Sequence, residues 1–61
     1  MKRKQIQTEL ESLAIGRTRM IAWEAVTRWS ADSYEIGTWG KKQSDLAATV
    51  DTLCILRGVT L

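Results

Sequence analysis

The sequence predicts an all-α fold of three short helices, at about residues 3–15, 18–36 and 45–57, that associates as a helical homodimer. Two observations lead to this prediction. Apolar residues recur at helical spacing in each of the three segments. The chain has only 61 residues, one cysteine and no histidine, so neither a large core, an internal disulfide nor a zinc site is available to stabilise it. Association with a second copy of this single small domain is the remaining source of stability.

The first segment has an amphipathic pattern that ends at a glycine. Its apolar stripe consists of Ile6, Leu10, Leu13 and Ala14. Its polar side consists of Gln5, Thr8, Glu9, Glu11 and Ser12. Gly16 follows at a position suited to a left-handed C-terminal cap. The pattern predicts a helix over 3–15.

The last segment carries start and stop signals as well as a stripe. Ser44 is the expected N-cap, Asp45 is expected in the first turn, and Arg57 precedes Gly58 at the end. The apolar stripe consists of Leu46, Ala47, Val50, Leu53 and Cys54. Ile55 and Leu56 leave this stripe, which indicates a helix packed between two surfaces. We therefore expect the outer side of this helix to form the homodimer interface.

The central segment allows two interpretations. As a helix it places Ala22, Ala25, Val26 and Trp29 on one face, and this is the interpretation that the spacing favours. The alternative is an α+β fold in the order α-β-β-α, with a hairpin across 20–39. In that fold "SADS" would form the turn before a second strand in "YEIGTW". The tryptophan, tyrosine and β-branched residues of this segment favour strands. The glycine-containing stretch 37–43 is expected to be a connecting loop in both cases.

The residue types argue against an enzyme. Histidine, the commonest general acid or base, is absent. Cys54 lies on the stripe of the last helix and is expected to be a small buried hydrophobe rather than a nucleophile. No phosphate-binding loop is present, and no cofactor or metal is expected. No apolar run is long enough for a membrane span, and the start "MKRKQIQTELESLA" is not a secretory signal, so a cytoplasmic protein is expected.

The three tryptophans indicate protein–protein binding. Trp29 lies on the predicted helical face and is expected to be buried. Trp23 lies at the edge of that face and Trp39 lies in the loop, so both are expected at a contact surface. With Ile55 and Leu56 they form the predicted partner-binding set. The expected function is that of a small regulatory or adaptor protein. Its size, basic start and lack of catalytic residues resemble those of small accessory proteins of phages and plasmids, although no family's diagnostic residues are matched.

The positive charge is concentrated at the start of the chain. Residues 1–19 carry five cations and two anions, a balance of +3, whereas residues 20–61 carry four cations and five anions, a balance of −1. The alternative function is therefore a small DNA-binding transcriptional or architectural factor. It would use a flexible basic arm of residues 1–4. The nucleic-acid contacts of that alternative are Lys2, Arg3, Lys4, Arg17 and Arg19. We expect such binding to be weak.

Overall fold

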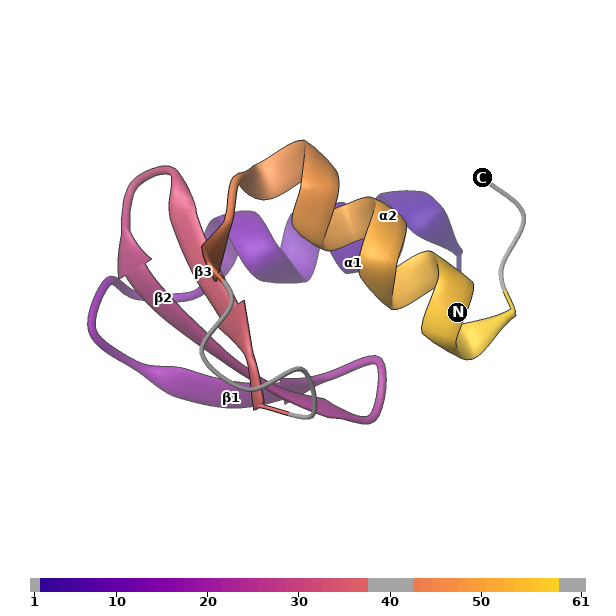
Figure 1. Cartoon of the computed structure of the whole chain (residues 1–61), viewed down its shortest axis with the longest axis horizontal. Coiled ribbons are helices and arrows are strands. Elements are labelled where there is room, and N and C mark those ends of the chain that lie inside the picture. The colour runs from indigo at the N-terminus through magenta and orange to yellow at the C-terminus, as the bar shows by residue number, and fades with distance from the viewer. Residues whose placement is uncertain (1, 38–42, 59–61) are drawn as a thin grey trace.

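The computed structural model describes residues 2–37 and 43–58 and has an α+β fold. The elements, in chain order, are α1 (Arg3–Ser12), β1 (Thr18–Ile21), β2 (Glu24–Ser30), β3 (Ser33–Ile36), β4 (Gln43–Ser44) and α2 (Leu46–Arg57). The first three strands form an antiparallel sheet, and the two-residue β4 pairs with the edge of β3. Both helices lie on one side of this sheet (Figure 1).

The predicted all-α, three-helix fold is wrong because 18–36 forms strands instead of a helix. The pattern was misleading because side-chain polarity does not alternate cleanly along these strands. Val26 is buried on the helix-facing side of the sheet, and its register partner Arg19 lies on that same side. Conversely, Met20 and Trp29 are exposed, with 61% and 51% of their surface accessible. The apolar residues of the two faces together therefore imitate a helical stripe.

The α+β alternative has the correct class but lacks β1 and the two-residue β4. Its "SADS" turn is present, since Ser30 pairs with Ser33 at the end of the β2–β3 hairpin. Of these two strands, β1 pairs antiparallel with β2 from Thr18 to Ile21. The turn between them contains neither glycine nor asparagine, the residues that usually mark such a turn in a sequence.

The core lies between the helices and the inner face of the sheet. Each of the two helices and each of the first three strands contributes to it. Its buried apolar residues are Ile6, Leu10, Leu13, Ile21, Ala22, Val26, Tyr34, Ile36, Val50, Leu53 and Cys54. The stripes predicted for the two terminal segments supply six of these eleven residues, which explains why those two helices were recognisable.

The C-terminal end of α1 is capped by side chains of the sheet. The helix has no basic residue in its last turn, and it ends at Leu13 without the left-handed glycine cap predicted at Gly16. Arg19 donates to the Glu9 carbonyl at 2.7 Å, Tyr34 donates to the Leu10 carbonyl at 3.0 Å, and Arg28 donates to the Glu11 and Leu13 carbonyls at 3.1 and 2.9 Å. These donors satisfy carbonyls that a helix end otherwise leaves unpaired.

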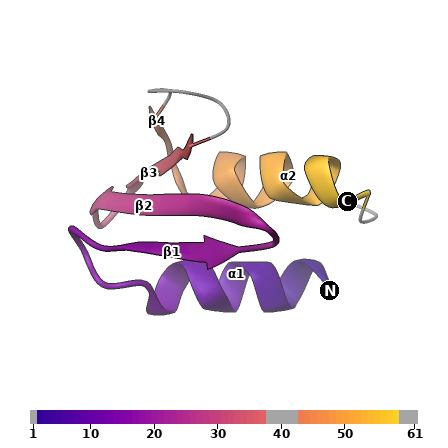
Figure 2. The same cartoon turned by 90° about the horizontal axis from the view of Figure 1, so that it is seen from below.

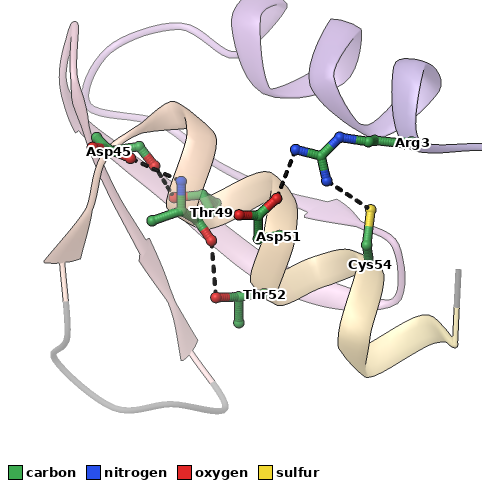
Figure 3. A network of polar contacts seen from close by, with 7 residues as sticks. Arg3, Asp45, Thr49, Asp51, Thr52 and Cys54 are labelled. Atoms are coloured by element: carbon green, nitrogen blue, oxygen red, sulfur yellow. Dashed lines mark hydrogen bonds and ion pairs between the residues drawn. The ribbon is translucent and has the colours of Figure 1, made fainter. Parts of the chain in front are cut away.

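Helix α2 agrees closely with its prediction. Its N-cap is Asp45, one residue after the expected Ser44, and the Asp45 carboxylate accepts from the Ala48 N–H at 2.8 Å. Gly58 ends the helix in the left-handed conformation, with φ of 71°. Figure 3 shows how α1 is tied to α2: the Arg3 guanidinium lies 2.6 Å from the Asp51 carboxylate and 3.9 Å from the Cys54 sulfur.

The prediction that Trp29 is buried is also wrong. Trp29 lies on β2, and its indole N–H donates to the Glu35 carboxylate of β3 at 2.9 Å. On the same outer side of the sheet, the Thr18 and Thr27 hydroxyls are 2.6 Å apart. The polar atom that a tryptophan must satisfy is paired here at the surface rather than in the core.

Candidate functional site

The turn between β1 and β2 holds a tryptophan in an unfavourable backbone conformation. Ala22 and Trp23 both have positive φ, 51° and 68° respectively, as a two-residue type I′ turn requires. This region costs a residue with a Cβ about 1–2 kcal/mol, and asparagine or glycine is the usual choice. Nevertheless 73% of the Trp23 surface is exposed, so the ring contributes little to the core.

Three elements converge at this turn to form a shallow depression, which we call the tip pocket. It has a volume of about 310 Å³ and is lined by Glu9, Met20, Ala22, Trp23 and Arg57. In Figures 1 and 2 the β1–β2 turn points toward the last turn of α2. Glu9 comes from α1 and Arg57 is the last residue of α2.

Two electrostatic features distinguish the tip pocket. The Arg57 guanidinium carbon lies 5.4 Å from the centre of the Trp23 ring, a cation–π contact. The Oε2 atom of Glu9 is buried and has no hydrogen-bond partner among the described residues. Arg19 does not satisfy this atom, because it donates to the main-chain carbonyl of Glu9 and to Ser12 instead.

Arg57 reaches the pocket because of its place on the helix. It follows Val50 and Leu53 at helical spacing, so its side chain continues the buried stripe one turn beyond the end of the core. Arg57 is exposed there, and its guanidinium lies over the Trp23 ring.

The structure places the predicted partner-binding residues as follows. Trp23 is exposed, as predicted, and so are Ile55 and Leu56, with 64% and 38% of their surface accessible. Leu56 directly precedes Arg57, so both residues lie in the last turn of α2. Trp39 lies outside the described residues.

The predicted nucleic-acid residues are not brought together. The basic arm of residues 1–4 is helical from Arg3 onward, and Arg3 pairs with Asp51. Arg19 is held by the end of α1. Lys2, Lys4 and Arg17 are exposed, but Arg17 follows the C-terminal end of α1 whereas the two lysines lie at its N-terminal end.

Sequence reasoning missed Glu9, Met20, Ala22 and Arg57 as residues of one site. Glu9 was assigned to the polar face of a helix, and that assignment gives no sign of a buried oxygen. The positive φ values at Ala22 and Trp23 have no sequence signal either. Only the exposure of Trp23 was predicted.

Two pKa values shift in the described structure. The hydrogen bond to the Asp51 carboxylate raises the pKa of the Arg3 guanidinium, with smaller contributions from Cys54. Burial raises the pKa of Tyr34 above its ordinary value of 10.0, and the nearby Arg28 guanidinium partly opposes this effect. Both groups keep their usual protonation at neutral pH.

Within residues 2–37 and 43–58, no group of three or more histidine, cysteine, aspartate or glutamate side chains is arranged to hold a metal ion. In the same part of the chain, neither helix has the length and apolar character needed to cross a membrane. Comparisons with protein-family models, with curated proteins and with solved structures found no match.

Proposed function

We propose that this protein is a small, non-enzymatic adaptor or regulator that binds another protein through the tip pocket and the adjoining end of α2. The observation that carries the proposal is Trp23, a large ring held at positive φ and 73% exposed. Neither property favours folding, because the backbone conformation is strained and most of the ring stays in water. Strained residues of this kind concentrate at functional sites, and tryptophan is enriched at the energetic centres of protein interfaces.

Ile55 and Leu56 extend this apolar end and are the residues that we propose for self-association. They lie on the outer part of α2, away from Val50, Leu53 and Cys54, which are buried in the core. The homodimer interface proposed here therefore adjoins the tip pocket. The free, buried Cys54 is compatible with the cytoplasm, where we propose that the protein acts.

The experiment compares two exposed tryptophans. Tagged parent protein, a Trp23→Asn variant and a Trp29→Thr variant are used to capture partners from a lysate of the host, with nuclease added. Asparagine tolerates the left-handed backbone and threonine suits a strand, so both variants should retain the circular dichroism spectrum of the parent. We expect Trp23→Asn to lose a partner that Trp29→Thr retains.

The proposal is refuted if Trp23→Asn captures the same proteins as the parent. It is also refuted if every captured protein disappears on nuclease treatment, because recovery would then depend on nucleic acid. The latter result would favour the DNA-binding alternative.

A further inference from the structure

The tip pocket contains a carboxylate oxygen that no described side chain satisfies. Oε2 of Glu9 is buried without a hydrogen-bond donor, while Glu9 as a residue is only half-buried and lines the tip pocket. An ionised carboxylate accepts hydrogen bonds only, and an unpaired buried one is unfavourable. The missing group is therefore a donor, and a positively charged donor is the best complement.

The Trp23 ring, which lines the same pocket, shows which kind of donor fits. Its face already receives a guanidinium group, that of Arg57, at 5.4 Å from the ring centre. The pocket thus combines an aromatic face, an acceptor oxygen and the apolar side chain of Met20. A cationic side chain with an aliphatic stem complements all three.

We infer that the tip pocket receives an arginine or lysine side chain of the partner protein, which pairs with Glu9 and lies against Trp23. This inference rests on the proposed protein-binding function and adds the chemistry of the partner. Arg57 is exposed and occupies the Trp23 face in the free protein, so it competes with the incoming side chain. An anionic side chain would pair with Arg57 but would face the Glu9 carboxylate.

The test uses small probes and the full chain, observed by two-dimensional ¹H–¹⁵N NMR. The cationic probes are N-acetyl-arginine amide and N-acetyl-lysine amide. N-acetyl-norleucine amide is the neutral control, and N-acetyl-glutamate amide is the anionic control. We expect the cationic probes alone to cause saturable shifts of the Trp23 indole N–H and of the Met20 and Ala22 amides, with dissociation constants in the millimolar range.

Three variants assign the effect to named groups. Glu9→Gln preserves the shape of the side chain but removes its charge, and should weaken binding of the arginine probe by about tenfold or more. Arg57→Gln removes the competing cation and should strengthen binding about two- to fivefold. Glu11→Gln is the matched control, since Glu11 is an exposed carboxylate of α1 that does not line the pocket. The spectrum of each variant reports whether it is folded.

Several results would overturn the inference. Equal NMR shifts with the norleucine probe would show that the pocket is an apolar surface that does not select for charge. An unchanged affinity of Glu9→Gln for the arginine probe would show that the Glu9 carboxylate does not bind the cation. Stronger binding of the glutamate probe, lost in Arg57→Gln, would assign the pocket to an anionic partner. If Trp23→Asn abolishes partner capture but the cationic probes do not bind the parent protein, the proposed function stands and this inference is refuted. If the probes bind through Glu9 while Trp23→Asn leaves capture unaffected, the pocket accepts a cation, but the proposed function falls and the assignment of that cation to a partner protein falls with it.

Discussion

Arg28 is the side chain whose loss should most weaken the contact between the sheet and α1. Its guanidinium donates to the Glu11 carbonyl of α1 at 3.1 Å and to the carbonyl of the C-cap residue Leu13 at 2.9 Å. Two further hydrogen bonds, at 3.3 and 2.9 Å, reach the Ser30 and Ala31 carbonyls at the β2–β3 turn. The guanidinium carbon also lies 5.3 Å from the centre of the Tyr34 ring.

The size of the effect follows from how exposed these bonds are. The bond to Leu13 is partly buried, and a hydrogen bond from a charged donor is worth about 1.5–3 kcal/mol in such a setting. The three exposed bonds exchange readily with water and add about 0.5 kcal/mol each at most. We therefore expect Arg28→Met to lower the free energy of unfolding by about 2–4 kcal/mol. That is a large share of the roughly 3–9 kcal/mol expected for a chain of this length.

The assay is urea unfolding followed by circular dichroism, with Arg17→Met as the matched control. Arg17 also adjoins the end of α1, but its side chain is exposed, and within the described residues its main chain makes its hydrogen bonds, to Ala14 and Arg28. Its replacement should change the free energy of unfolding by less than about 0.5 kcal/mol. Arg28→Lys should recover only part of the loss, because an ammonium group lacks the planar fork of donors. If Arg28→Met is no more destabilising than Arg17→Met, the sheet does not cap α1 in the way described.

The remaining predictions concern pH, assembly and nucleic acid. The raised pKa of Tyr34 means that its contribution to stability is complete below about pH 10 and is lost as the pH rises through 10 toward the folded pKa. The free energy of unfolding, measured with urea, should therefore fall between about pH 8 and pH 11, and it should fall less in Tyr34→Phe. An identical fall in both proteins would contradict this. Ile55→Glu should shift the proposed dimer to monomer in sedimentation equilibrium, whereas Ala47→Glu at the start of the same helix should not. A parent protein that is monomeric at high concentration would refute the proposed homodimer. Lys2, Lys4 and Arg17 can together neutralise about three phosphates, so DNA binding should be weak, with a log–log salt slope near −3 at about 0.9 per phosphate. Tight, sequence-selective binding at physiological salt would instead support the DNA-binding alternative.

The two terminal helices were predictable because their signals are local. In α2, the stripe of Leu46, Val50 and Leu53 lies within one segment, and Gly58 marks its end. Each of these features can be recognised without knowing what the helix packs against. Ile55 was expected at a second packed surface; it is 64% exposed here, so its place at a homodimer interface stays a prediction.

The central segment was not predictable in this way because its side chains are explained by distant partners. Glu24 and Arg28 have the spacing of a favourable pair on a helix, yet residues four apart also share one side of a strand. Arg28 lies on the inner side of the sheet since the carbonyls of Glu11 and Leu13 are there to accept from it. Those acceptors become available only when α1 packs beside the sheet.

The amino-acid sequence by itself therefore determined the two amphipathic helices and the left-handed glycine that ends the second. The tertiary structure decided the strands, the capping of α1 by the sheet, and the meeting of Glu9, Trp23 and Arg57 at one end of the molecule. The physical reason is the range of the forces involved. Helical periodicity and caps act within a few residues, whereas strand pairing depends on groups far apart in the chain. The positive φ at Trp23 depends on the same distant pairing, because the register of β1 with β2 leaves only two residues for the turn.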